Sequence, residues 1–427
     1  MDKKRIAVIF LIVLTNAMAA TAILPMLPIY VEGQFQATPV QAMLVIAAYY
    51  ASQFVAAPIL GKLSDRLGRR PILIVSQIGT IVAYLLFLFA APLGDAIGVT
   101  LGMSGGLVIV YLARLMDGLT DGNVSVAEAY ASDISDEKSR ARALGLIGGA
   151  GGLGHIVGPG LAFALSGISL TAPMVGAVVM GVVTLLLTIF LLDESHTPEK
   201  RTVQHTATAD LSVLRLLASR PVALILGAGF IVSLYIATLY SSFSLYASRV
   251  LFPDASAEVV AQNVNLLIMV FGVAGAVSQI FLIAPLVKRF GEQRLVVLGG
   301  LLLMGSAIGI STGSLPVVLV AMLAFSLGFG VSFPSLQAIM TRFGSNDTTG
   351  KRLGLLKSAF SLAFIVAPLM AGFLLENFGA QTIFYNGALL MGVATVLGIL
   401  IMHITVPGTA QVKDEAPEGG LLRHLHH

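Results

Sequence analysis

The sequence predicts an all-α membrane protein in which twelve transmembrane helices form two pseudo-symmetric six-helix bundles. Three observations predict this architecture: an apolar composition, twelve apolar runs of membrane-spanning length, and an internal repeat. The 427-residue chain is 56% hydrophobic and only 11% charged, whereas an ordinary soluble domain is about one quarter charged. So few charges would leave the surface of a soluble protein apolar, and a soluble enzyme is therefore excluded.

The same composition excludes several kinds of site and partner. The chain contains no Cys, which removes disulfides, thiolate metal sites and cysteine nucleophiles. The net charge is +3, but the basic residues are scattered between apolar runs, which argues against a nucleic-acid partner. No metal or cofactor is expected. The expected partners are protons, membrane lipids and a small-molecule solute, and the expected state is a monomer.

Apolar runs long enough to cross the hydrocarbon core, which takes about 20 residues, follow one another along the chain. They lie near 6–30, 40–60, 71–91, 105–131, 142–165, 173–192, 221–247, 261–284, 295–312, 316–341, 353–375 and 382–405. The chain therefore divides into four parts. These are an N-terminal half (1–192), a linker with a short amphipathic helix (193–220), a C-terminal half (221–405) and a tail expected to be disordered (406–427).

The distribution of Lys and Arg predicts the orientation, because basic residues gather on the cytoplasmic side. Among connections that follow odd-numbered spans, Arg249 is the one basic residue, and Arg114 lies inside span four. The remaining 23 of the 25 Lys and Arg lie at the N-terminus, in the other connections or in the tail. Both termini are therefore predicted to be cytoplasmic.

An internal repeat relates the two halves. Residues 142–165 align with residues 351–374 without a gap, and the turn at 65–68 is echoed at 288–291. Parallel repeats of this kind build one class of secondary transporters, in which the binding site lies near the middle of the membrane between the halves.

Span four carries four ionisable residues. Arg114, Asp117, Asp121 and Glu128 fall on one stripe of a continuous helix at 100° per residue. An ionised group near the bilayer centre costs about 2.5–3.5 kcal/mol on insertion scales, so the stripe should face a water-filled cavity or another helix. One arginine cannot neutralise three carboxylates, and at least one carboxylate should therefore hold a proton. The alternative is a buried Arg114–Asp117 ion pair that only joins helices.

Other polar and aromatic side chains within the spans are candidates for lining a cavity beside this stripe. They are Asn16 in span one, Gln53 in span two, Tyr235 and Tyr240 in span seven, and Gln337 in span ten. For each of them, ordinary packing in the helix bundle is the alternative interpretation.

Span five is rich in small residues that allow another helix to approach closely. Gly154, Gly158 and Gly160 belong to this group, and Pro159 can bend the helix. We expect Gly158 to contact the other half, so that a bulky side chain there would prevent the halves from moving against each other.

The stretch Gly61–Pro71, GKLSDRLGRRP, lies between spans two and three and resembles the signature loop of the major facilitator superfamily. The resemblance implies that this loop is a conformational gate, with Asp65 near the N-terminus of a neighbouring helix and Arg69 paired with Asp133. The implied gate residues are Gly61, Asp65, Arg66, Gly68, Arg69, Arg70 and Asp133.

Further motifs narrow the resemblance. Gly154–Gly160, GHIVGPG, resembles that family's motif of drug/proton antiporters, and Arg114 followed by Gly118 resembles a motif whose arginine is linked to proton coupling. Leu24–Pro28 and Ala131–Asp133 resemble the twelve-span tetracycline-exporter branch. The resemblance implies a multi-pass protein of the plasma membrane, which is the inner membrane in a bacterium.

These observations favour a secondary active transporter over an enzyme. The leading hypothesis is proton-coupled efflux of an amphipathic or cationic small molecule by alternating access, with the proton gradient as the energy source. The alternative is a proton-coupled importer, or a facilitator, of a nutrient or lipid-like solute.

Overall fold

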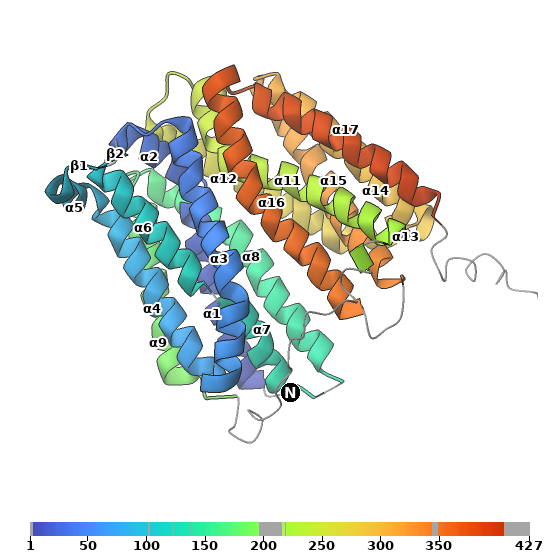
Figure 1. Cartoon of the computed structure of the whole chain (residues 1–427), viewed down its shortest axis with the longest axis horizontal. Helices are drawn as coiled ribbons and strands as arrows, with labels where there is room; N and C mark the ends of the chain where they lie inside the picture. Colours follow the sequence, from blue (N-terminus) through green and yellow to red (C-terminus); the bar gives the residue numbers. More distant parts are fainter. Residues whose placement is uncertain are drawn as a thin grey trace, which may run out of the picture.

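The computed structural model describes residues 3–100, 103–121, 123–136, 138–195, 216–217, 219–343 and 349–404, and it is almost entirely helical (Figure 1). Within these residues, 11 helices are long and apolar enough to cross a membrane, which confirms the predicted membrane class. The predicted amphipathic helix of the linker and the predicted disordered tail fall largely or wholly outside the described residues.

In the described residues, the N-terminal half consists of nine helices and a short hairpin. They are α1 (Lys3–Ile23), α2 (Leu27–Phe35), α3 (Pro39–Leu67), α4 (Arg69–Leu88), α5 (Ala90–Ile97), β1 (Val99–Thr100), β2 (Met103–Ser104), α6 (Gly105–Thr120), α7 (Asn123–Asp133), α8 (Arg140–Ser166) and α9 (Ala172–Leu191). The strands pair antiparallel, with Val99 opposite Ser104.

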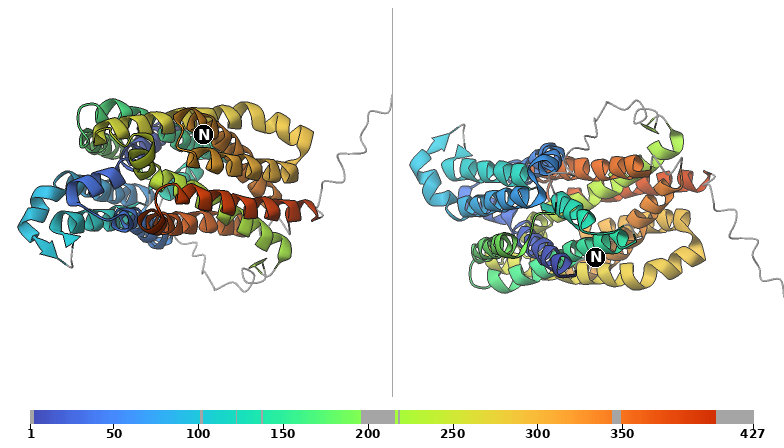
Figure 2. Two further views of the ribbon diagram at one scale, coloured as in Figure 1. Left: turned by 90° about the horizontal axis from the view of Figure 1, so that it is seen from above. Right: turned by 90° about the horizontal axis from the view of Figure 1, so that it is seen from below.

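The C-terminal half repeats the long helices and adds two π-helical segments. Its elements are α11 (Arg220–Tyr246), η2 (Ala247–Leu251), α12 (Ala257–Val277), η3 (Ser278–Leu282), α13 (Ile283–Phe290), α14 (Glu292–Ser311), α15 (Leu315–Thr341), α16 (Thr349–Phe378) and α17 (Thr382–Met402). The two halves lie side by side when the molecule is viewed from either end (Figure 2).

The twelfth predicted span is present but is not a single helix. The stretch 105–131 is divided between α6 and α7, and α6 alone has 16 residues, so neither piece reaches the length of a spanning helix. The predicted continuous helix in span four is therefore wrong. This break also separates Glu128, on α7, from the three ionisable residues that precede it.

The internal repeat is visible in the backbone of both halves. Gly68 between α3 and α4 has φ 107°, and Gly291 between α13 and α14 has φ 77°. Both values lie in the left-handed region that favours glycine. The signature stretch is mostly helical rather than a loop, because α3 continues to Leu67 and only Gly68 interrupts it.

The helices of the two halves stand at an angle to each other (Figure 1). We call the end that carries the N-terminus the basic face and the other end the opposite face. Near the opposite face the halves are joined: the backbone N–H of Val40 donates to Glu376 across 3.0 Å, and Arg249 pairs with Glu32 at 3.0 Å. Gly160 likewise lies against Met269.

Toward the basic face the facing helices are uncovered. Gly148, Gly149 and Gly152 of α8 are exposed, and no atom of another segment lies within 4 Å of the position that a Cβ would take on them. Lys357 and Glu128 approach across the halves at 3.8 Å, with exposed fractions of 72% and 41%. The described conformation is therefore closed at the opposite face and loosely joined at the basic face.

Candidate functional site

The break in span four places polar backbone in the middle of the bundle. α6 ends at Thr120, and Asp121 leaves the helical region with φ −79° and ψ 71° while its N–H donates to Gly118 O across 3.3 Å. The Asp121–Gly122 dipeptide is a turn signal that the apolar average of the span conceals. Discontinuous helices of this kind form the binding sites of several transporter folds.

Arg114 and Asp117 form a buried ion pair one turn before the break. Arg114 Nη1 lies 3.1 Å from Asp117 Oδ2, and the two residues are only 4% and 3% exposed. The guanidinium carbon also lies 4.7 Å from the ring centre of Phe87 and 5.4 Å from that of Tyr49. Among the described residues, Nε and Nη2 of Arg114 have no hydrogen-bond partner.

Asp121 is bound by two side chains of α3. Its carboxylate accepts hydrogen bonds from Tyr49 Oη and from Gln53 Nε2, the latter across 2.7 Å. Gly118 makes this possible, because a Cβ at that position would collide with Ser52 and the carbonyl oxygen of Tyr49. The close approach of α6 to α3 therefore brings the tyrosine and the glutamine onto the carboxylate.

We call Tyr49, Gln53, Arg114, Asp117 and Asp121 the polar cluster. If both carboxylates are ionised, the cluster carries two negative charges and one positive charge. One negative charge is then in excess, and either a proton or a cation can neutralise it.

Glu128 does not belong to this cluster. It lies on α7, is partly exposed, and faces Lys357 of the other half. The prediction of one stripe with all four ionisable residues is therefore wrong beyond Asp121, because the helical register does not continue through the break.

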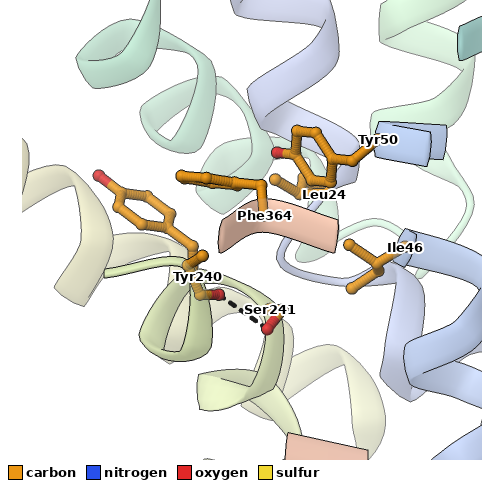
Figure 3. Close-up of a pocket in the computed structure, with 7 residues that line it drawn as sticks. Leu24, Ile46, Tyr50, Tyr240, Ser241 and Phe364 are labelled. Carbon is orange, nitrogen blue, oxygen red and sulfur yellow. Dashed lines mark hydrogen bonds between the residues drawn. The ribbon is translucent and has the colours of Figure 1, made fainter. Parts of the chain in front are cut away.

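Beside the polar cluster, side chains of both halves meet in a closing layer. Leu24, Ile46 and Tyr50 come from the N-terminal half, and they face a set from α11 and α16 that comprises Ala237, Tyr240, Ser241 and Phe364. Figure 3 shows Phe364 between Tyr50 and Tyr240, and it marks the hydrogen bond from Ser241 Oγ to Ala237 O. The space left among these side chains is too narrow for a water molecule.

Ring contacts continue from this layer into the C-terminal half. Tyr49 touches Tyr50 with ring centres 4.9 Å apart, and Tyr50 touches Phe364 at 4.9 Å. The contacts then run through Phe360, Phe333 and Phe329 at 4.8, 5.4 and 5.9 Å. We call Tyr50, Phe364, Phe360, Phe333 and Phe329 the aromatic row. Sequence reasoning missed it, although the i, i+4 spacing within α15 and α16 was visible.

The remaining cavity candidates have different surroundings. Tyr240 lies in the closing layer, and Asn16 is half-buried on α1. Tyr235 is fully buried inside the C-terminal half, where it contacts Ser306 and Phe325, so its predicted place at a cavity is wrong in this conformation. Gln337 is exposed on α15.

Of the predicted gate residues, Asp65 and Asp133 meet around Arg69, which is 7% exposed. Its guanidinium lies 2.6 Å from Asp65 and 3.1 Å from Asp133, and its Nη1 donates to Ser64 Oγ across 2.6 Å. The predicted ion pair with Asp133 is thus present. All of these partners of Arg69 lie in the N-terminal half. Arg66 is exposed.

A residue that sequence reasoning missed completes this cluster. Glu194 accepts the backbone N–H groups of Arg69 and Arg70 across 2.9 and 3.2 Å, where the N-terminus of α4 favours a negative charge. The Arg70 side chain donates to Ile189 O at the end of α9 across 2.6 Å. The start of α4 is therefore tied to α3, α7 and α9.

The small residues of span five serve two different contacts. Gly154 and Gly158 lie against α1 of the same half, where a Cβ on Gly158 would collide with Met18 and Thr21. Pro159 is buried, and Gly160 faces Met269 of α12. The expectation that Gly158 contacts the other half is therefore wrong, since that role falls to Gly160 on another side of the helix.

Comparisons with known proteins identify the family. The model of the family described as "Major Facilitator Superfamily" matches residues 9–253 and 234–425. The class C tetracycline resistance protein of Escherichia coli is 30% identical over 369 residues, which is 85% of this chain and 85% of that protein.

Two further similarities are informative. Multidrug resistance protein 2 of Bacillus subtilis is 26% identical over 86% of this chain and 89% of that protein. The crystal structure of the human organic anion transporter MFSD10 superposes with a TM-score of 0.63 at 25% identity, covering 93% of this chain and 99% of that one.

Proposed function

Because this chain belongs to the major facilitator superfamily, we propose that it exports an amphipathic or cationic small molecule in exchange for protons. It does so by alternating access, without a cofactor, and the proton gradient supplies the energy. The basic face lies in the cytoplasm, so both termini are cytoplasmic, and the membrane is the inner membrane of a bacterium. The similarity to tetracycline and multidrug resistance proteins supports export.

The observation that carries this proposal is the polar cluster beside the break in span four. Two carboxylates and one arginine lie in this cluster, and one of the carboxylates, Asp117, is almost completely buried. A charge in such surroundings is retained in membrane proteins mainly where it serves a pathway for ions, protons or solutes.

The chemistry of exchange follows from the excess negative charge of the cluster. A proton and a cationic solute compete for the same charge, so binding of the solute releases the proton. This competition links the two fluxes, because the effect of one ligand on the other is reciprocal. A solute that enters from the cytoplasm reaches the cluster while the opposite face is closed.

The residues around Arg69 make the basic-face end of the N-terminal half rigid. Asp65, Arg69, Asp133 and Glu194 join the basic-face ends of α3, α4 and α7 within one half. We propose that this cluster stays intact as the halves rock, and that Asp65 gains a partner in the other half when the basic face closes.

Transport in proteoliposomes with an imposed pH gradient tests the proposal. Wild-type protein should accumulate tetracycline or a cationic dye against its concentration gradient. Asp117→Asn and Asp121→Asn should abolish accumulation and allow at most slow downhill movement, since each removes one competing charge. Asp95→Asn is the matched control, because Asp95 is exposed on α5 at the opposite face.

Two outcomes would contradict the proposal in different ways. If both Asn variants and the double variant still accumulate solute, the cluster is structural and Glu128 becomes the candidate for proton coupling. If the wild type instead concentrates a sugar or lysolipid and ignores cations, the chain is an importer or facilitator of a nutrient or lipid-like solute.

A further inference from the structure

The aromatic row lies on the route between the basic face and the closing layer. In α16, Lys357, Phe360 and Phe364 follow one another along one helical face, and α16 begins at the basic face. Lys357 faces Glu128 of the other half, and Phe364 is part of the closing layer. Phe360 therefore lies one turn inside the exposed ion pair and one turn below the closing layer.

The rings of the row are not part of the closed core. Tyr50, Phe329, Phe333, Phe360 and Phe364 are all half-buried, whereas Phe325 and Phe384 of the same half are fully buried. Each residue of the row therefore keeps an uncovered portion. Aromatic rings gain about 0.5–1.5 kcal/mol from a well-placed aromatic partner beyond the apolar area that they cover.

The row belongs mainly to one half. In the ungapped alignment of the repeat, Phe360 and Phe364 correspond to Gly151 and His155 of α8. The repeat alone thus does not require rings at these positions. The N-terminal half supplies charge at the polar cluster, and the C-terminal half supplies ring surface.

The two sites are physically connected. Tyr49 donates to the Asp121 carboxylate, and its ring touches Tyr50, the first member of the row, at 4.9 Å. A solute lying against the row would therefore have the polar cluster near one end and ring faces along its length.

We propose that the aromatic row is the specificity determinant of this transporter, selecting flat aromatic cations over aliphatic cations of the same charge. This inference rests on the proposed function for its cation, but recognition by the rings is a binding property and does not require proton coupling or a direction of transport. It can therefore be tested separately.

The chain has no Trp, so Phe360→Trp places a single fluorescent reporter in the row. Ethidium serves as the flat aromatic cation and tetrapentylammonium as the aliphatic one. Ethidium should quench the fluorescence of purified Phe360→Trp saturably, and excess tetrapentylammonium should displace it weakly. Phe373→Trp is the control, because Phe373 lies on the same helix but is 56% exposed and pairs with Phe378 outside the row.

Removal of a ring provides the second readout. Phe333→Leu and Phe360→Leu should each weaken ethidium binding about 2- to 10-fold, the loss expected for one aromatic contact. The same two variants should change tetrapentylammonium binding less than twofold. Phe360→Tyr, which keeps a ring at this position, should bind ethidium as the wild type does. Phe373→Leu should leave both unchanged.

Three results would overturn the inference. They are quenching that is equal in Phe360→Trp and Phe373→Trp, an equal loss of both cations in the Leu variants, and unchanged ethidium binding in those variants. Failure of proton-driven accumulation in liposomes, with saturable and selective quenching retained, would contradict the proposed function and leave the aromatic row as a binding site.

Discussion

Span four and its counterpart in the second half occupy corresponding places in the repeat but carry different polar groups. If the spacing of the repeat is extended along the chain, Asp117 corresponds to Ser326, and Asp121 corresponds to Gly330. The counterpart helix, α15, is unbroken over 27 residues. The Ser326 hydroxyl donates to the carbonyl oxygens of Phe271 and Met322, each at 3.0 Å. Because serine is neutral, this position of α15 carries no charge that needs a partner.

The same contrast appears at the basic face with the sign exchanged. Arg69 at the start of α4 pairs with Asp133 at the end of α7, and Glu292 at the start of α14 pairs with Arg342 after α15. Both halves therefore place an ion pair at this junction, but the positive charge lies on different helices.

The largest effect is expected at the buried pair of the N-terminal half. Arg114→Leu leaves Asp117 without its partner and should lower the free energy of unfolding by about 3–5 kcal/mol. Arg114→Leu combined with Asp117→Leu should recover much of that loss. In the C-terminal half, Ser326→Ala should cost only about 1 kcal/mol. Denaturation in detergent measures all four proteins, and a double variant no more stable than Arg114→Leu would contradict the pairing.

Exchange of charges at the basic face tests whether the two junctions are equivalent. Arg69→Glu combined with Asp133→Arg should lose about 1.5–3 kcal/mol, because Asp65 and Ser64 then lose a charged partner. Glu292→Arg combined with Arg342→Glu should change stability by less than about 1 kcal/mol, since Arg342 is 34% exposed.

Equal losses in the two halves, measured as shifts of the thermal midpoint in the same detergent, would show that the additional partners of Arg69 contribute nothing. A loss of stability found only for the charge exchange in the C-terminal half would contradict the predicted difference.

The close approach of α3 and α6 should be intolerant of a single methyl group. Gly118→Ala should cost about 1–3 kcal/mol through overpacking and reduce solute accumulation, because it pushes Tyr49 away from Asp121. Gly148→Ala is the control, since its Cβ would meet nothing within 4 Å. Equal behaviour of the two variants in thermal unfolding and transport would refute this role of Gly118.

The smallest effect on stability is expected where the halves meet at the basic face. Lys357→Gln should change the free energy of unfolding by no more than about 1 kcal/mol, because the pair with Glu128 is exposed and long. Glu128→Gln should change the free energy of unfolding by the same small amount. In a double-mutant cycle, the double variant should lose no more stability than either single variant. A coupling above that range would mean that this pair holds the conformation.

Sequence alone determined the membrane class and the positions of most spans, and the resemblance of its signature stretch implied the ion pair of Arg69 with Asp133. These features depend on long apolar runs and on a motif whose residues lie near the ends of neighbouring helices. The apolar runs are a strong signal because lipid tolerates few alternatives to a helix of apolar side chains. The roles of the pair and of the remaining site residues stay predictions.

Only the tertiary structure decided how span four ends and what meets it. Hydropathy averaged over the span conceals the turn at Asp121, and helical periodicity then places Glu128 on a stripe that it does not share. The contact of Asp121 with Tyr49 and Gln53 depends on how closely α3 approaches Gly118. That distance is set by packing between segments far apart in the chain, which no local pattern of residues encodes.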